Sequence, residues 1–104
     1  MLTLNQLLII GRIGGPPKTF GKIAKVSIAT DRHWTDKDGE AKSATDWVTI
    51  SIVDAKQAEW AAATLKKGDG VFVKARVAET KYETAGQRVY GVEVVAAMVT
   101  GVPP

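Results

Sequence analysis

One helical segment stands among stretches with strand-like patterns, and this combination restricts the fold more than any other feature of the 104-residue chain. Residues 55–67, AKQAEWAAATLKK, place small apolar side chains at helical spacing. Asp54 is the predicted N-cap of this helix, and Gly68 is its predicted stop. The other patterned segments alternate apolar with polar residues or are bounded by turn residues, as strands are. The predicted strands are 4–13, 22–31, 46–53, 71–82 and 88–99.

Five strands with one helix between the third and the fourth predict an all-β domain. The arrangement is typical of a five-stranded Greek-key barrel of the oligonucleotide-binding type, the OB fold. We expect Asp38-Gly39 to turn the chain between the second and third strands, and Ala85-Gly86 between the last two. A chain of this length forms one domain, which we assign to residues 1–100, with 101–104 as a short C-terminal end.

The composition excludes several classes of chemistry. The chain has no cysteine and a single histidine, His33, so it offers neither disulfides nor a structural zinc site, and we expect no metal and no cofactor. No pairing of a nucleophile with a base is visible, so we expect no enzymatic activity. The net charge of +3 permits a polyanionic partner but does not require one.

The hydrophobic runs are too short to span a bilayer, and the first six residues lack the features of a signal peptide. These observations predict a protein without membrane contact that stays in the cytoplasm, where a nucleic-acid partner would associate it with the nucleoid.

The third predicted strand carries a large aromatic side chain on its polar face. In DWVTISIV, residues 46–53, alternation places Ile50 and Ile52 toward the core and Trp47 with Thr49 on the opposite face. In an OB fold this face of the sheet, around the second and third strands, binds the ligand. Trp47 is therefore a candidate for stacking on a base, and an oligomer interface is the alternative interpretation.

The fourth predicted strand combines cations and aromatic rings on its outward face. Lys74 and Arg76 share this face with Phe72 and Tyr82, and Lys81 lies beside them. Proteins that bind single strands need both kinds of side chain, because cations follow the phosphates while flat rings stack on bases of any identity. Tyr82 can alternatively be an amphipathic hairpin residue, and Phe72 is interpreted as a core residue at the barrel end.

Two further tryptophans fit this pattern less directly. Strict alternation groups Trp34 with the core side of the second strand, and we expect a twist or bulge beyond Thr30 to turn it outward. A core-edge position or a dimer contact is the alternative. Trp60 lies opposite the apolar stripe of the predicted helix. We expect it to pack over its own helix and a neighbouring loop, with a partner contact as the alternative.

From Leu8 to about Val99 the chain resembles the bacterial single-stranded DNA-binding protein family. The matching motifs are SIAT at 27–30, Trp34, DKDGE at 36–40, TDW at 45–47, LKKG at 65–68, VFV at 71–73 and the hairpin 80–90. The resemblance implies an OB fold and sequence-tolerant binding of single-stranded DNA in replication, recombination and repair. It also implies a homo-oligomer, a tetramer in most members, with a dimer as the alternative.

Carried over by position, Trp34 and Trp47 match base-stacking tryptophans of the family, and Tyr82 stands where the family has a third one. The family's stacking phenylalanine at the end of the third strand is absent, because Val53 or Asp54 occupies that place. The predicted phosphate-binding residues are Arg12, Arg32, Lys56, Lys67, Lys74, Arg76, Lys81 and Arg88.

Two departures from the family pattern affect the expected partners. The segment Gly15 to Lys22 is shorter than the usual loop between the first two strands, and the last residues, 101–104, carry no acidic tip. Recruitment of repair enzymes through an acidic tail is therefore not expected. The absence of the stacking phenylalanine and of the acidic tip leaves a second hypothesis open, in which the chain is an OB-fold accessory protein of replication restart that acts mainly through protein contacts.

Overall fold

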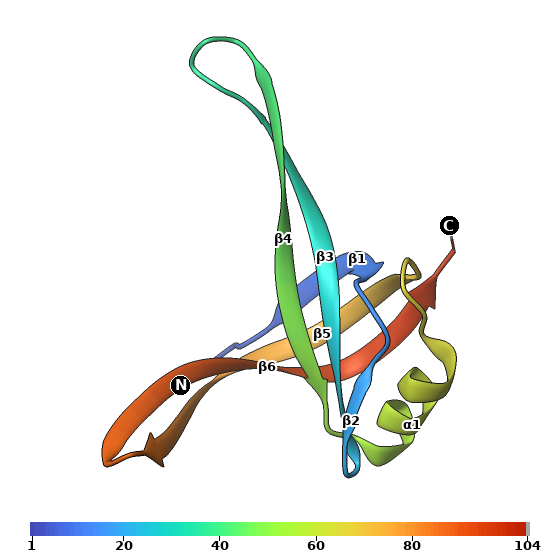
Figure 1. Ribbon diagram of the computed structural model, residues 1–104, viewed down its shortest axis with the longest axis vertical. Coiled ribbons are helices and arrows are strands. Elements are labelled where there is room, and N and C mark those ends of the chain that lie inside the picture. Colours follow the sequence, from blue (N-terminus) through green and yellow to red (C-terminus); the bar gives the residue numbers. More distant parts are fainter. Residues whose placement is uncertain (104) are drawn as a thin grey trace.

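The structure is a computed structural model that describes residues 1–103, and within them it contains six strands and one helix (Figure 1). The elements are β1 (Leu7–Ile13), β2 (Lys18–Phe20), β3 (Ile23–Thr35), β4 (Ala41–Ile52), α1 (Ala55–Thr64), β5 (Gly70–Thr84) and β6 (Gln87–Val102). The five long strands correspond to the five predicted ones, with the helix between the third and the fourth of them. The short strand β2 was not predicted. The expected C-terminal end, 101–104, falls partly within β6, and its last residue lies outside the described residues.

The sheet closes on itself. Hydrogen-bonded neighbours follow the order β1-β5-β6-β4-β3-β2, and an additional pairing of β1 with β3 completes the ring. All pairs are antiparallel except β4 with β6, whose strands run parallel. This closed five-stranded barrel with one helix confirms the predicted OB fold. Within the ring β5 neighbours only β1 and β6, so its outer surface lies on a different side of the barrel from the outer surface of β3 and β4.

The core follows the alternation in the sequence. The largest side chains without solvent contact come from β1, β3, β4 and β5, namely Ile13, Val26, Ile28, Ile50, Ile52, Val71 and Val73. From α1 and the residue after it, Ala58, Ala61 and Leu65 complete the same cluster. Ser51 departs from the pattern, since it lies on the polar face of β4 and is nevertheless buried, with strands paired on both of its sides.

The helix begins as predicted and ends earlier than predicted. The carboxylate of Asp54 accepts a hydrogen bond of 3.0 Å from the backbone N–H of Gln57, which confirms the N-cap. The helix ends at Thr64 instead of residue 67, because Leu65 is already extended. The backbone N–H of Gly68 donates to the carbonyl of Ile13 at 2.8 Å. Pairing with β1 thus replaces the last helical turn.

Two long hairpins project from the barrel in different directions (Figure 1). The register of β3 with β4 continues without interruption from Ala24 opposite Ile52 to Thr35 opposite Ala41. Of the predicted twist or bulge beyond Thr30, the bulge is therefore wrong. Trp34 is exposed for another reason, because the ribbon leaves the barrel and both of its faces meet solvent.

The second hairpin joins β5 to β6. Ala85 and Gly86 form its two-residue turn with positive φ angles of 48° and 75°. Two positive φ angles are characteristic of the type I′ turn, whose twist matches that of the flanking strands. The predicted turn is confirmed.

Candidate nucleic-acid interface

Trp47 lies on the outer face of β4, where 61% of its surface is exposed. In the register its neighbour on β3 is Ala29, and Thr49 lies opposite Ser27 on the same face. The indole approaches the backbone of Gly14 so closely that a Cβ there would lie 2.4 Å from ring atom Cζ3. Only glycine at position 14 allows this approach, so the end of β1 positions the indole while leaving most of it open to solvent.

A groove with a volume of about 430 Å³ adjoins this indole. Phe20, at the end of β2, is 58% exposed. Strand β3 lies between it and Trp47, because β2 and β4 pair with the two edges of β3. The full lining is Gly14, Gly15, Pro16, Lys18, Phe20, Lys25, Ser27, Trp47 and Thr49. Two aromatic rings, two ammonium groups and no carboxylate line the groove. This is the chemistry that an anionic strand with flat bases requires.

Of these nine lining residues only Trp47 was a predicted site residue, so the prediction missed the aromatic and basic side chains of Lys18, Phe20 and Lys25. A signal for Lys25 was present in the sequence, because it alternates with the buried residues Ala24 and Val26. No comparable signal existed for Phe20, since β2 has only three residues and acquires its position by pairing with β3.

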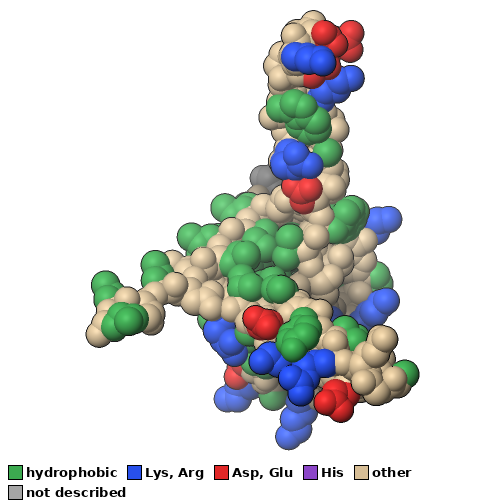
Figure 2. Space-filling view, turned by 90° about the vertical axis from the view of Figure 1, so that its left-hand side faces the viewer, with side chains coloured by type: hydrophobic (Ala, Val, Ile, Leu, Met, Phe, Trp, Pro, Cys, Tyr) green, Lys and Arg blue, Asp and Glu red, His purple; other side chains and the backbone are tan. Residues whose placement is uncertain are grey.

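The projecting β3–β4 hairpin carries Trp34 next to basic side chains. The guanidinium of Arg32 lies 5.2 Å from the centre of the Trp34 ring, within the range of a cation–π interaction. Its Nε donates a hydrogen bond of 2.6 Å to the carboxylate of Asp46, and Lys42 lies opposite Trp34 in the register. Figure 2 shows a hydrophobic side chain between basic ones on this arm. By register Trp34 and Trp47 lie on opposite faces of the ribbon, so a strand that reaches both must follow the ribbon's twist or cross its edge.

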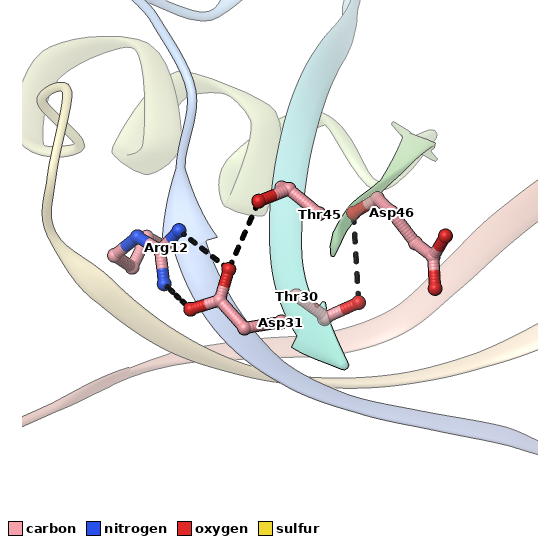
Figure 3. Close-up of polar contacts among 5 residues, drawn as sticks. All are labelled: Arg12, Thr30, Asp31, Thr45 and Asp46. Atoms are coloured by element: carbon pink, nitrogen blue, oxygen red, sulfur yellow. Dashed lines mark hydrogen bonds and ion pairs between the residues drawn. The ribbon is translucent and has the colours of Figure 1, made fainter. Parts of the chain in front are cut away.

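An ion pair ties β1 to the base of this hairpin (Figure 3). Arg12 donates from Nη1 to Oδ2 of Asp31 at 2.6 Å and from Nη2 to Oδ1 at 3.2 Å, and the hydroxyl of Thr45 donates to Oδ1 at 3.1 Å. The hydrogen bond from Arg12, and to a smaller extent the one from Thr45, lowers the pKa of Asp31. The hydrogen bond to Asp31 in turn raises the pKa of Arg12. Since a guanidinium has five N–H donors, Arg12 keeps others for a second anion.

The β5–β6 hairpin also combines rings with cations. Tyr82 is exposed opposite Val89, and the ammonium group of Lys81 lies 5.9 Å from the centre of the exposed Tyr90 ring. Arg88 pairs with the carboxylate of Glu83 at 3.9 Å. Tyr90 was not among the predicted site residues, although the two-residue turn at Ala85 and Gly86 sets a register that places it opposite Lys81. This arm points away from the β3–β4 arm (Figure 1).

The remaining predicted cations lie elsewhere on the molecule. Lys74 and Arg76 extend from the outer surface of β5, which does not adjoin the surface that carries Trp47. Lys56 lies on α1, and Lys67 lies in the turn after it. The structure therefore does not gather the predicted cations around one tryptophan but distributes them around the barrel.

Two further features are absent from residues 1–103. In this part of the chain no group of three or more His, Cys, Asp or Glu side chains is arranged to hold a metal ion. A helix long and apolar enough to cross a membrane is likewise missing from the same residues.

Comparison with known proteins agrees with this geometry. Residues 4–101 match the model of the "Single-strand binding protein family". A single-stranded DNA-binding protein of Neisseria meningitidis serogroup A is 32% identical over 87 residues, which cover 79% of this chain and 49% of that protein. The chain thus spans about half the length of the curated relatives it matches.

Solved structures show the same similarity. The structure of the Plasmodium falciparum SSB in complex with ssDNA superposes with a TM-score of 0.83 at 28% identity, covering 99% of this chain and 98% of that one. The wild-type protein of Thermus aquaticus gives a TM-score of 0.79 at 24% identity over 96% of this chain and 50% of that one, which supports the fold. The matched family consists of DNA-binding proteins that are not enzymes. The chain belongs to the single-strand binding protein family.

Proposed function

We propose that the protein binds and protects single-stranded DNA without sequence preference during replication, recombination and repair. The observation that carries this proposal is the groove on the outer face of β2, β3 and β4, where Trp47 and Phe20 accompany Lys18 and Lys25 without any carboxylate. Flat rings stack on every base, and ammonium groups attract the phosphates between the bases. Neither contact depends on base identity, so the binding is tolerant of sequence.

The same proposal gives a role to each predicted site residue. Trp34, Trp47 and Tyr82 stack on bases, and all three side chains are exposed. The phosphate contacts come from Arg12, Arg32, Lys56, Lys67, Arg76, Lys81 and Arg88. Lys74, predicted with them, lies between Leu8 and Met98 at the oligomer contact proposed below. Because the phosphate-binding cations lie on several sides of the barrel, a bound strand that contacts all of them must wrap around the protein. No covalent step is involved, and the location that follows is the cytoplasm, in association with the nucleoid.

We also propose that the chain forms a homo-oligomer, a tetramer by family resemblance, through the outer face of β1, β5 and β6. Leu8, Ile10 and Met98 are exposed there and are neighbours of β5 in the register. Figure 2 shows hydrophobic side chains gathered on the body of the molecule below the projecting hairpin. An exposed aliphatic cluster of this kind marks a protein contact. It is also the feature that favours the second hypothesis, an accessory protein acting through protein contacts.

A titration with oligo-thymidine separates the two functions. Stacking predicts that intrinsic tryptophan fluorescence is quenched as the DNA binds, and that the logarithm of affinity falls linearly with the logarithm of salt concentration. A light-scattering mass measured on the same sample reports the oligomer. Unchanged fluorescence together with no binding of labelled DNA would contradict DNA binding and favour the accessory protein.

A further inference from the structure

We propose that Trp60 forms a second base-stacking site on helix α1, outside the sheet, which receives a base of the DNA after the strand has passed over the end of β1. This inference rests on the proposed function and extends it, because the strands of the sheet contribute no aromatic ring to this site. It assigns a DNA contact to an indole that the sequence analysis placed against its own helix and a neighbouring loop, with a partner contact as the alternative.

The indole lines a cleft with a volume of about 500 Å³. Trp60 is 38% exposed, so packing against the helix and the loop leaves part of its ring open. The full lining is Arg12, Trp60, Thr64, Leu65, Gly68, Asp69, Gly70, Gly101 and Val102. Three of these residues are glycines, and a Cβ added to Gly68 or Gly101 would meet no atom within 4 Å. The lining therefore includes open backbone, which leaves room for a planar ring beside the indole.

The charges around this cleft suit a phosphate chain. Arg12 lines it, Lys56 lies one helical turn before Trp60, and Lys67 lies in the turn that borders it. One carboxylate, that of Asp69, also lines the cleft, and it accepts a hydrogen bond from the backbone N–H of Lys66. The carboxylate of Asp31 accepts the hydrogen bonds of Arg12. Glu59, the residue before Trp60, lines a different cleft.

Of the predicted phosphate-binding cations, Arg12 lines the cleft of Trp60, while Lys56 and Lys67 lie near it in the chain, on α1 and in the turn after it. None of the three lines the groove of Trp47.

The two sites are connected through a short segment of backbone. Gly14 borders the groove of Trp47, and Arg12 borders the cleft of Trp60. Between them lies Ile13, which is buried, with an N–H that donates to the carbonyl of Asp69 and a carbonyl that accepts from the N–H of Gly68, both at 2.8 Å. Along β1 the two depressions are therefore separated by one buried residue, whose backbone is held by two hydrogen bonds.

A variant with Trp60 as its single tryptophan tests the stacking directly. Trp34→Phe with Trp47→Phe keeps flat rings on the sheet side and removes the other indole signals. We expect the fluorescence of Trp60 to be quenched as a long oligo-thymidine binds, with the anisotropy of a labelled oligonucleotide reporting the binding itself. If anisotropy shows saturation while the Trp60 signal stays unchanged, the inference is overturned and the proposed function stands.

A second variant tests the energetic role in the otherwise unchanged chain. Trp60→Leu keeps an apolar side chain on the helix but removes the flat ring. Affinity for an oligo-thymidine of about 16 nucleotides should fall by about five- to tenfold, and affinity for one of about four nucleotides should not change. The matched control is Ile23→Ala, since Ile23 is also 38% exposed and borders the other side of α1.

The outcomes of this comparison are distinct. The inference is supported if Trp60→Leu lowers the affinity for the long oligonucleotide, Ile23→Ala does not, and both variants keep the melting curve of the unaltered protein. No loss, or an equal loss for both oligonucleotide lengths, overturns it. If the unaltered protein binds neither oligonucleotide, the proposed function itself fails, so the two failures are separable.

Discussion

The barrel has two exposed outer faces that depart from a plain polar surface in different ways. On the barrel part of β2, β3 and β4 the most exposed apolar side chains are the flat rings of Phe20 and Trp47, set among lysines and hydroxyls. On the barrel part of β1, β5 and β6, away from the hairpin that carries Tyr82 and Tyr90, the most exposed apolar side chains are aliphatic, such as Leu8 and Ile10. Branched aliphatic groups gain by packing against other aliphatic groups, whereas rings beside cations suit stacked bases and their phosphates. Exposed apolar surface alone therefore does not identify the kind of partner. The shape of the exposed side chains and the charges beside them indicate whether the partner is a protein or a nucleic acid.

The largest expected effect comes from placing a carboxylate on each face in turn. Ile10→Glu should break the homo-oligomer, because an uncompensated charge in an apolar interface costs about 3–5 kcal/mol. The light-scattering mass should fall toward that of one chain. Binding of a short oligo-thymidine should persist, since the groove of Trp47 lies on another side of the barrel.

The reciprocal control is Thr49→Glu, which places the same charge in the groove. It should weaken DNA binding and leave the mass unchanged. If Ile10→Glu leaves the mass unchanged, or Thr49→Glu lowers it, the two faces have been assigned to the wrong partners.

Trp47→Ala should weaken DNA binding by about 1–3 kcal/mol, the range for a base stacked on an aromatic side chain. The fold should be retained because the indole is largely exposed and lies outside the core cluster. Binding is followed by the anisotropy of labelled oligo-thymidine, and the fold by a melting curve. An unchanged titration beside an unchanged melting curve would remove Trp47 from the interface.

Gly14→Ala tests whether the end of β1 positions this indole. An added Cβ would lie 2.4 Å from Cζ3 of Trp47, so the ring must move. In a double-mutant cycle with Trp47→Ala we expect a coupling of about 0.5–3 kcal/mol in DNA binding, as for residues in contact. Gly15→Ala is the matched control, since a Cβ there meets no atom within 4 Å. A coupling of zero would mean that the ring adjusts without cost.

Much of this comparison could be read from the sequence, and the reasons differ from residue to residue. The side of β4 on which Trp47 lies follows from alternation, because each strand residue points opposite to its neighbours. The turns at Gly39 and Gly86 follow from residue types that tolerate positive φ, and both glycines adopt it.

Other features could not be predicted from the sequence, because they depend on how distant segments pair and not on the local residue pattern. Phe20 enters the groove only because three residues of β2 pair with β3. The exposure of Trp34 comes from the length of the β3–β4 ribbon beyond the barrel, which is a property of the whole hairpin. The opposite placement of Lys74 and Trp47 follows from the order of strands in the ring, while alternation reports only that both point outward.

The salt dependence of binding distinguishes the cations of the two faces. With a short oligo-thymidine, Lys25→Gln should reduce the slope of log affinity against log salt by about 0.7, the value for one phosphate contact on a single strand. Lys74→Gln should leave the slope unchanged, because Lys74 lies opposite Met98 and Leu8 on the aliphatic face. An equal reduction in both variants would show that even a short strand reaches around the barrel.

The smallest expected effect concerns Arg12, which stands at the border of the two DNA-binding depressions and is held by Asp31. Hydrogen bonds from Arg12 and Thr45 place the pKa of Asp31 below its ordinary value of 3.8. A carboxyl whose pKa is lower in the folded state stabilises the fold above its unfolded-state pKa, and this contribution is lost as the pH falls through the folded-state value. Both side chains are exposed, so the change in melting temperature between pH 6 and pH 3 should be slight.

The NMR titration of the Asp31 carboxyl is the more direct measurement. In Arg12→Gln its pKa should rise toward the ordinary value, because the charged partner that favours the carboxylate is gone. Bound oligo-thymidine offers a second test, since a phosphate that draws Arg12 away from Asp31 should raise the same pKa in the unaltered protein. If DNA leaves the pKa of Asp31 unchanged, Arg12 keeps its ion pair with Asp31 during binding. Its role is then to hold β1 against the β3–β4 hairpin, and it makes no phosphate contact of its own.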